Sequence, residues 1–313
     1  MTKKKITTED FLRMFNCRQD ELPEQFVTKF RNVDTTYSEA NLDEYKEFFL
    51  NTLKYIDSVN ARNETETYRA FEKGWNENLK LFSDTGSLED LIPKYVKPSK
   101  FLRFNQELIV TENPRLEYEL FTLARYIIFS KYLKSFDNIY EFGCGSCQNL
   151  YLLSQMYHSK QIYGMDWSES SVKIANKLGQ QLNMKGYLFD MKGYLFDMMR
   201  PQKSFKLQQD SAVFTVGALE LLGTDFDKFL SFLVRSKPGV VLHYEPIREF
   251  YDPECLLDYL AIMHDSKRNY LSGYLTRLKE LQDQNKIEII ESRRTYLGGP
   301  HHEATSIIAW KPL

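Results

Sequence analysis

The sequence has few of the residues that define several common classes of protein. Only 4 of its 313 residues are cysteines, too few for a disulfide framework in a chain of this length. No apolar run approaches the roughly 20 residues that a membrane-spanning helix needs, and the N-terminus does not have the pattern of a signal peptide. We therefore expect a soluble, reduced, cytoplasmic protein with no membrane partner.

A strong charge of one sign is also absent. The chain has 41 basic and 43 acidic side chains, a formal net charge of −2. The basic run at Lys3, Lys4 and Lys5 is best interpreted as a solvated tail. Without a basic field we expect no nucleic-acid partner. The length allows one large domain, or one domain with an extension, and either can bury a substantial core.

The most informative stretch is residues 138–168, whose pattern predicts a strand, a glycine turn, a helix and a second strand. The pattern consists of an apolar run at 139–142, the glycines Gly143 and Gly145, a candidate helix cap at Asn149, and a strand at 161–165 that ends on Asp166. In such a βαβ unit the glycines let a ligand approach the backbone and the helix N-terminus offers free N–H groups. A carboxylate after the second strand meets ribose hydroxyls, so the stretch predicts a nucleotide-type site.

The glycine spacing distinguishes two classes of ligand. A dinucleotide site of the G-x-G-x-x-G type would have its third glycine at position 148, where this chain has Gln148. The chain instead has acid-x-Gly-x-Gly beginning at Glu141, which resembles motif I of the class I S-adenosylmethionine (SAM) methyltransferases. One departure is Cys147 at the third small position of that motif. The resemblance covers roughly residues 139–313 and does not identify a subfamily.

The resemblance implies an α/β fold. The expected sheet has seven strands, is mostly parallel with an antiparallel last strand, and carries helices on both faces. The later segments fit this order, with strands at 211–216, 240–246, 287–293 and 305–310, and a helical segment at 258–282 that Gly273 interrupts. Residues 101–313 are therefore expected to form the SAM-binding domain.

Residues 1–100 are expected to form a helical N-terminal cap. Asn41 followed by Glu44 has the pattern of a capping box, and a second helix is expected to end before Gly86. Similar N-terminal segments of the family close over the acceptor, so this one could do the same. Binding of a partner protein is the alternative, and the sequence does not separate the two.

A seven-residue duplication occupies the position of the third strand. Residues 184–190 read Met-Lys-Gly-Tyr-Leu-Phe-Asp, and residues 191–197 repeat them. In the family this strand ends on an acid that accepts a hydrogen bond from the adenine amino group, a role open to Asp190 or Asp197. A shift of seven inverts the faces of a strand, so the two copies are not interchangeable. We favour Asp197, which continues directly into Met198.

The resemblance assigns the SAM site to residues around these acids. Glu141 is expected at the methionyl end, Asp166 at the ribose, and Trp167 beside the sulfonium or the adenine, or else in the core. Cys144 and Cys147 have redox or metal spacing, but without a second pair we do not assign them that role. The residues expected to contact SAM are Tyr118, Glu141, Phe142, Gly143, Cys144, Gly145, Asp166, Trp167, Asp190, Asp197, Met198, Val216 and Gly217.

The acceptor side is expected at the carboxyl ends of strands four and five and in the loop before the last strand. Three of the 5 histidines fall there. An imidazole that titrates near neutrality can remove a hydroxyl proton as the methyl group arrives, and His302 is the leading candidate. A divalent metal held by a His/His/Glu set and plain surface histidines are the alternatives, with the base favoured over the metal. The candidate catalytic residues are His243, Glu245, His301 and His302.

The favoured function is SAM-dependent methylation of a small polar molecule, through oxygen, with a sugar or other hydroxylated metabolite as the acceptor. The Asn/Asp-Pro-Pro-aromatic motif of enzymes that methylate nucleobase or glutamine nitrogens is absent, since positions 216–219 read Val-Gly-Ala-Leu. N-methylation of a small metabolite and a non-catalytic SAM-binding or partner-binding role are the alternatives. The sequence leaves the oligomeric state open.

Overall fold

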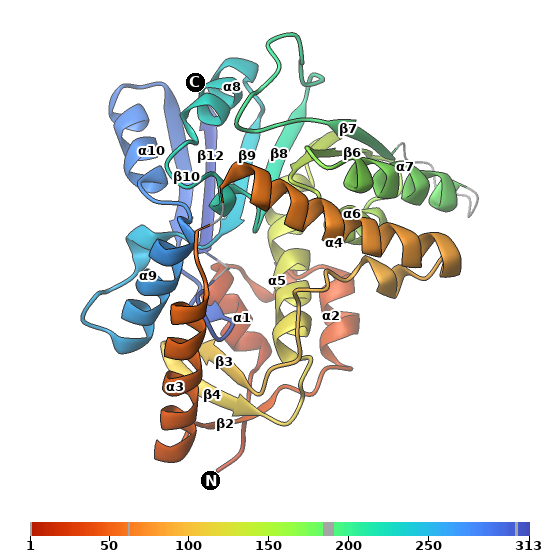
Figure 1. The fold of residues 1–313 in the computed structure, drawn as a ribbon. Helices are drawn as coiled ribbons and strands as arrows, with labels where there is room; N and C mark the ends of the chain where they lie inside the picture. Colours follow the sequence, from red (N-terminus) through yellow and green to blue (C-terminus); the bar gives the residue numbers. More distant parts are fainter. Residues whose placement is uncertain (1, 62, 184–190, 304–305) are drawn as a thin grey trace.

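The structure, a computed structural model, describes residues 2–61, 63–183, 191–303 and 306–313 (Figure 1). Its centre is a seven-stranded sheet in the order β10-β12-β9-β8-β5-β6-β7. These strands are β5 (Asn138–Phe142), β6 (Gln161–Asp166), β7 (Met191–Leu195), β8 (Ser211–Val216), β9 (Val240–Glu245), β10 (Ile287–Arg293) and β12 (Ser306–Pro312). Strands β5 to β9 are parallel, whereas β12 is antiparallel to both of its neighbours. The predicted sheet and its antiparallel last strand are confirmed.

Helices cover both faces of this sheet, as predicted. On one face pack α5 (Leu116–Leu133), α6 (Gln148–Met156) and α7 (Glu169–Asn183), and on the other α8 (Asp227–Ser236) and α10 (Tyr274–Asp283). Side chains alternate along each strand. Leu242 therefore joins the core beneath α5, while Val241 joins the core beneath α8 and α10.

A second, antiparallel sheet was not predicted. Its strands are β1 (Lys4–Lys5), β2 (Thr36–Glu39), β4 (Glu107–Thr111), β3 (Phe101–Phe104) and β11 (Leu297–Gly298), in that order across the sheet. The expectation that the first 100 residues are helical is therefore wrong at β1 and β2. Because β2 pairs with β4, and β3 with β11, the sheet joins the N-terminal region to later parts of the chain. The division of the chain at residue 100 stays a prediction.

The remaining helices surround the two sheets. The predicted capping box of Asn41 and Glu44 opens α3, and α4 ends at Gly86, whose φ is +66°. Helix α3 lies beside α9, and α4 crosses to α7 (Figure 1). These elements are α1 (Thr8–Phe15), α2 (Glu24–Phe30), α3 (Leu42–Ser58), α4 (Glu64–Thr85), α9 (Leu256–Arg268) and the 3₁₀ turns η1 (Gln19–Glu21), η2 (Leu88–Leu91), η3 (Leu219–Leu222) and η4 (Arg248–Phe250).

The duplicated segment supplies strand β7 from its second copy. Strand β7 begins at Met191 and pairs with β6, so Asp197 follows it within the same copy. The alternative residue Asp190 lies outside the described residues.

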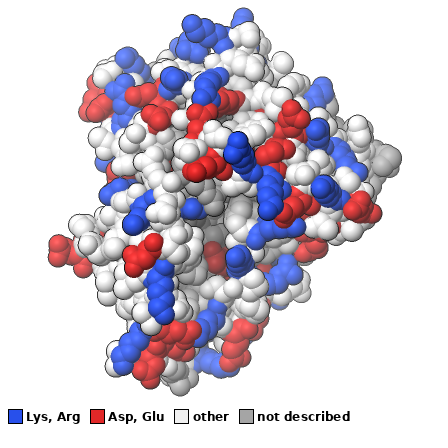
Figure 2. All heavy atoms as spheres, in the orientation of Figure 1, with Lys and Arg blue, Asp and Glu red and all other residues white. Residues whose placement is uncertain are grey.

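Acidic and basic side chains are interspersed on the face of the molecule shown in Figure 2, as the balanced composition predicts. The same view shows a hollow at the centre of this face, below α4. Within the described ranges, none of the helices is both long and apolar enough to cross a membrane.

Candidate functional site

The turn between β5 and α6 requires glycine. Gly143 and Gly145 have φ values of +78° and +50°, a region that is costly for other residues. A β-carbon on Gly143 would lie 2.4 Å from the β-carbon of Ala218 and 3.6 Å from the Cε of Met198. The backbone therefore passes close to the predicted adenine-side residue Met198. Helix α6 begins one residue before Asn149, so the prediction that Asn149 caps it is wrong.

Glu141 ends β5 as a fully buried acid with one unsatisfied oxygen. The Asn149 amide nitrogen donates to Oε1 at 2.6 Å, while Oε2 is buried and has no hydrogen-bond partner. Burial raises the pKa of Glu141 well above its usual range, although the Asn149 bond and the charge of Arg125 oppose this shift. A buried carboxylate oxygen without a donor is costly. It fits the ammonium group of the methionyl end of SAM.

Arg125 of α5 organises the polar groups behind Glu141. Its Nη1 donates to the side-chain oxygens of Gln148 (3.1 Å) and Asn149 (2.8 Å), and its Nη2 donates to Thr122. The Gln148 amide in turn donates to the hydroxyl of Tyr118, a predicted cofactor residue, at 2.6 Å. Sequence reasoning missed Arg125, although an arginine inside an apolar helical stripe is the kind of signal that reveals such a group. A buried guanidinium here suits the methionyl carboxylate.

Asp166 ends β6 next to the same turn. Its Oδ2 accepts from the N–H of Gly145 and its Oδ1 from the N–H of Ser168, both at 2.8 Å. Burial raises the pKa of Asp166 to about 6, although these backbone bonds oppose the shift. Since β5 and β6 pair in parallel with Glu141 opposite Gly164, both acids lie at one edge of the sheet. The predicted position of the two acids at neighbouring strand ends is therefore present, while their methionyl and ribose roles stay predictions.

The other predicted cofactor residues fall into two groups. Phe142 turns its side chain into the core against Phe229, and Cys144 and Cys147 are buried with sulfurs 3.9 Å apart, so their backbones form the turn. Val216 is the last residue of β8, and Gly217 follows it directly. Gly217 is exposed, has φ +59°, and has no atom within 4 Å of the position of a β-carbon.

Asp197 is engaged in an ion-pair chain in this structure. It accepts from the N–H of Met199 at 2.8 Å and from Arg200 at 2.7 Å, and Arg200 also binds Glu64 of α4. The acid predicted to accept from adenine is thus part of a link between β7 and α4.

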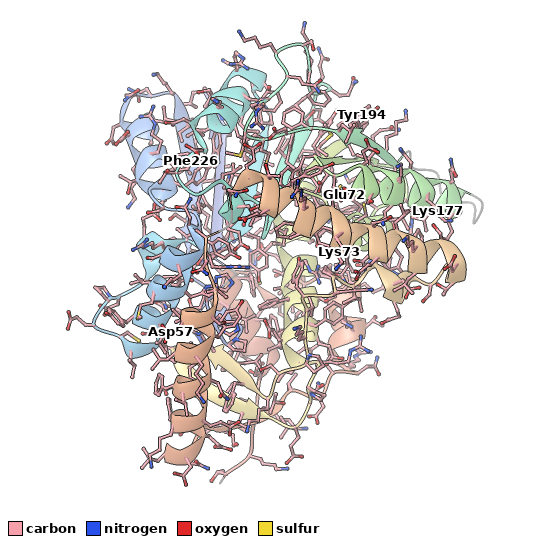
Figure 3. All side chains as sticks on the ribbon, in the orientation of Figure 1. Asp57, Glu72, Lys73, Lys177, Tyr194 and Phe226 are labelled. Carbon is pink, nitrogen blue, oxygen red and sulfur yellow. The ribbon has the colours of Figure 1, made fainter. Side chains whose placement is uncertain are left out.

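Helix α4 covers the cofactor residues. Trp75 lies over Gly145, where a β-carbon would come within 2.8 Å of the indole. Glu72 accepts from the hydroxyls of Ser168 (2.5 Å) and Ser170 (2.6 Å), and Figure 3 shows it on the side of α4 nearest α7. The half-buried Trp167 meets Tyr68 of α4 edge to face, with ring centroids 5.1 Å apart. The N-terminal region therefore covers the expected ribose site.

Tyr95 lies in the connector between α4 and β3, between the expected cofactor side and the expected acceptor side. The residue is 64% exposed, yet burial raises its pKa, with Glu220 and Glu141 adding to the shift and Arg125 opposing it. Glu141 lies on the expected cofactor side and Glu220 on the expected acceptor side, and the Tyr95 hydroxyl interacts electrostatically with both. Sequence reasoning did not identify Tyr95.

His243 and Glu245 have structural surroundings. The ring nitrogens of His243 lie 2.9 Å from Thr215 Oγ1 and 2.7 Å from the Tyr274 hydroxyl, and burial lowers its pKa to about 3. Both nitrogens are used inside the core beneath α10, which does not support a role as base. Glu245 accepts from the N–H groups of Ala218 and Leu219, both at 3.1 Å, and so holds the segment after β8.

His302 lies in a cluster that the sequence did not reveal in full. Its Nδ1 is 3.1 Å from Oδ1 of Asp265, and the same oxygen is 2.9 Å from Nδ1 of His264. Burial by itself would lower the pKa of His302, but the charge and hydrogen bond of Asp265, with Glu220, raise it overall. His301 stacks on Tyr55 with ring centroids 4.0 Å apart, and burial lowers its pKa to about 3.

Buried charges flank this cluster. Burial raises the pKa of Glu117 to about 7 and that of Glu220 to about 8, and His302 opposes both shifts. Arg103, fully buried, donates to the carbonyl oxygens of His301 (3.0 Å) and Leu257 (2.6 Å) and so fixes the histidine loop against α9. The expected acceptor side is therefore a polar wall in which Arg103 links the histidine loop to α9.

Three side chains of this wall also offer donor atoms for a metal ion. One donor atom each from His264, Asp265 and His302 lie within 4.8 Å of one another. Nitrogen and carboxylate donors of this kind suit Zn²⁺ and similar divalent ions.

Comparison with known proteins supports the fold. No protein-family model and no curated protein sequence matches the chain. The solved cyclase SpnF is 13% identical with a TM-score of 0.50, over 80% of this chain and 96% of SpnF. A geranyl diphosphate methyltransferase in complex with GPP and sinefungin is 12% identical with a TM-score of 0.46, over 78% and 98% of the two chains. The O-methyltransferase NcsB1 from neocarzinostatin biosynthesis is 14% identical with a TM-score of 0.38, over 63% and 58%.

The chain therefore has the class I fold of the SAM-dependent methyltransferases, as the sequence predicted. The strand order, the antiparallel β12 and the glycine turn after β5 agree with it. The subfamily is not identified.

Proposed function

We propose that the protein is a SAM-dependent methyltransferase that acts on a small polar molecule. The observation that carries this proposal is the unsatisfied Oε2 of Glu141, buried beside the glycine turn at the same sheet edge as Asp166. An acid at each of two neighbouring strand ends fits a ligand with an ammonium group at one end and a ribose at the other. Bound SAM would supply a methyl group on a sulfonium, which departs as a thioether.

The protein contributes position and exclusion of water. Glu141 and Arg125 hold the methionyl end, and Asp166 holds the ribose. Helix α4, through Trp75 and Glu72, closes over the turn. Correct placement of donor and acceptor can supply several kcal/mol of the barrier reduction. The proposed site needs no other cofactor for this step.

The acceptor binds beside His302 and is methylated on oxygen. His302 is the proposed base, because its Nδ1–H donates to Asp265 and leaves the Nε2 lone pair for the hydroxyl proton. The transfer forms an O–C bond as the S–C bond breaks, and the proton goes to His302. A hydroxylated metabolite such as a sugar is the acceptor class that this chemistry favours.

Calorimetry with SAM, S-adenosylhomocysteine and NAD(H) tests the cofactor. We expect the two sulfur nucleosides to bind and NAD(H) not to bind, and binding of NAD(H) alone would refute the proposal. The control is Glu112→Gln. This variant changes an exposed acid outside the proposed SAM site and should leave SAM affinity unchanged.

Release of S-adenosylhomocysteine with sugars, polyols and phenols, compared with amines, tests the reaction. Turnover with hydroxylated acceptors supports O-methylation, and turnover with amines alone shows N-methylation instead. Tight SAM binding without turnover over the whole panel would indicate a non-catalytic protein.

A further inference from the structure

Two histidines share one carboxylate oxygen on the acceptor wall. His264 and Asp265 are consecutive on α9, whereas His302 comes from the loop after β11. The two Nδ1 atoms lie 2.9 Å and 3.1 Å from the same Oδ1 of Asp265. The cluster is largely shielded from solvent, with side-chain exposures of 4% for His264, 2% for Asp265 and 18% for His302.

These separations match the first coordination sphere of one ion. Ligand atoms that lie about 2.0–2.2 Å from a metal are themselves roughly 3 to 4 Å apart. The two separations from the Asp265 oxygen meet this requirement, and all three donor atoms lie within 4.8 Å of one another. A small adjustment of the loop that carries His302 would bring all three within reach of one ion that replaces the two N–H···O bonds.

The charged groups around His264, Asp265 and His302 also bear on whether a divalent ion binds there. Oε2 of Glu220, which interacts with His302 electrostatically, is buried without a hydrogen-bond partner, so it adds an unsatisfied negative group that favours a cation in this region. The Arg103 guanidinium opposes a cation, but its donors are directed at backbone carbonyl oxygens.

We propose that His264, Asp265 and His302 form a binding site for one divalent transition-metal ion such as Zn²⁺, and that occupancy switches the His302 base off. The second part rests on the proposed function. An imidazole coordinated through Nδ1 carries its proton on Nε2, so that nitrogen can no longer accept the hydroxyl proton. Each neutral imidazole keeps one proton: as Nδ1 takes up the ion, the proton leaves Nδ1 and Nε2 takes one up from solvent, without any net proton loss or change of oxidation state. Metal occupancy and general-base catalysis therefore exclude each other.

Binding is tested without any acceptor, on the untagged full-length chain. Calorimetry with Zn²⁺ should show one site, and Co²⁺ should give visible d–d bands without the thiolate charge-transfer bands expected from Cys144 and Cys147. His264→Phe removes one ligand, leaves Asp265 and His302 in place, and should weaken Zn²⁺ binding at least about tenfold. The matched control is His158→Phe at an exposed position after α6, which should bind as the parent does. Circular dichroism confirms that both variants are folded.

The outcomes separate the two proposals. Absence of a Zn²⁺ site, or equal binding by His264→Phe and the parent, would overturn the metal site whatever the activity shows. If Zn²⁺ binds and inhibits methyl transfer in the parent but not in His264→Phe, the whole proposal is supported. If the bound ion instead activates transfer, the site stands and the switch is wrong. Failure to find any acceptor would refute the proposed function and leave the binding result intact.

Discussion

Trp75 of α4 lies directly over Gly145 of the glycine turn, where a β-carbon on Gly145 would come within 2.8 Å of the indole. The turn is thereby enclosed by a helix that precedes it by about seventy positions. The contact is reinforced by Glu72, whose carboxylate accepts from the hydroxyls of Ser168 and Ser170. We therefore expect ligand exchange at the turn to depend on movement of α4.

Replacement of the indole should accelerate release of the cofactor. We expect Trp75→Ala to raise the SAM dissociation rate about tenfold or more, because closure of α4 then buries less apolar surface over the turn. Stopped-flow fluorescence of Trp167, which lies beside α4, measures the rate. Trp75→Phe keeps an aromatic ring and should remain near the parent value. An unchanged rate in Trp75→Ala would show that release of the cofactor does not depend on the contact of Trp75 with the turn.

Neutralisation of the buried acid should weaken SAM binding without loss of stability. Glu141→Gln keeps an oxygen and the contact with Asn149 but loses the charge that meets the ammonium group. A charge-assisted hydrogen bond contributes about 1.5–3 kcal/mol, so SAM affinity should fall about ten- to a hundredfold. Because burial raises the pKa of Glu141, its charged form is costly in the fold, and the melting temperature should be equal or higher. A fall in both affinity and melting temperature would indicate a structural role instead.

SAM affinity should depend on pH through Asp166. Its pKa is raised to about 6 by burial, so below pH 6 the carboxyl is increasingly protonated and accepts less well from two ribose hydroxyls. Affinity should therefore fall as the pH is lowered from 7 to 5, up to about tenfold. Calorimetry over that range measures it. Asp166→Asn should bind weakly with a flatter profile, and a profile as steep as that of the parent would assign the titration to another group.

The free energy of unfolding should also depend on pH through Asp166, but in the direction opposite to that of SAM affinity. The folded-state pKa lies above the unfolded value near 3.8, so the unfolded chain loses its proton first. Stability of the SAM-free protein should fall as the pH rises from about 4 to about 6, by about 3 kcal/mol from this group, and then level off. Melting curves of the parent and Asp166→Asn, compared at pH 4.5 and 7, measure the difference. Equal changes in both proteins would contradict it.

Substitution of His302 should lower kcat, whereas substitution of His243 should lower the free energy of unfolding. His302→Ala should lower kcat about a hundredfold or more while SAM affinity stays nearly unchanged, because only the acceptor proton loses its base. His243→Phe should instead lower the free energy of unfolding by about 2 kcal/mol or more, since Thr215 and Tyr274 lose their partner in the core. Steady-state kinetics and thermal melts on both variants measure this. Loss of SAM affinity in His302→Ala would point to a structural role for that residue.

Much of the cofactor side was readable from the sequence because the βαβ unit is local. The glycines at 143 and 145 need positive φ, and a carboxylate follows or ends each strand, so Glu141 and Asp166 were placed correctly without long-range information. The order of the later strands followed from short apolar runs separated by turns. The second copy of the repeat forms β7, which begins at Met191, and the choice of Asp197 as the adenine acid stays a prediction.

The histidines show where the sequence pattern does not predict the surroundings of a side chain. Strand β9 is buried on both faces, so its residues form an almost continuous apolar run with no readable alternation. The position of His243 in that run could not show whether the ring faced the expected acceptor side or the core beneath α10. His302 was identified from its loop, but Asp265 and His264, which give it its surroundings, lie on a helix 37 and 38 positions earlier.

By itself the sequence determined the local units: the glycine turn, the two acids at strand ends, the capping box of Asn41 and Glu44 and the order of the strands along the chain. Neighbouring residues encode these through backbone preference and short-range periodicity. Only the tertiary structure decided that Glu72 binds a serine 96 positions away, that Arg103 holds a loop 198 positions away, and that strands from both ends of the chain join a second sheet. Such contacts arise from the packing of separate elements, and no local pattern records which elements will meet.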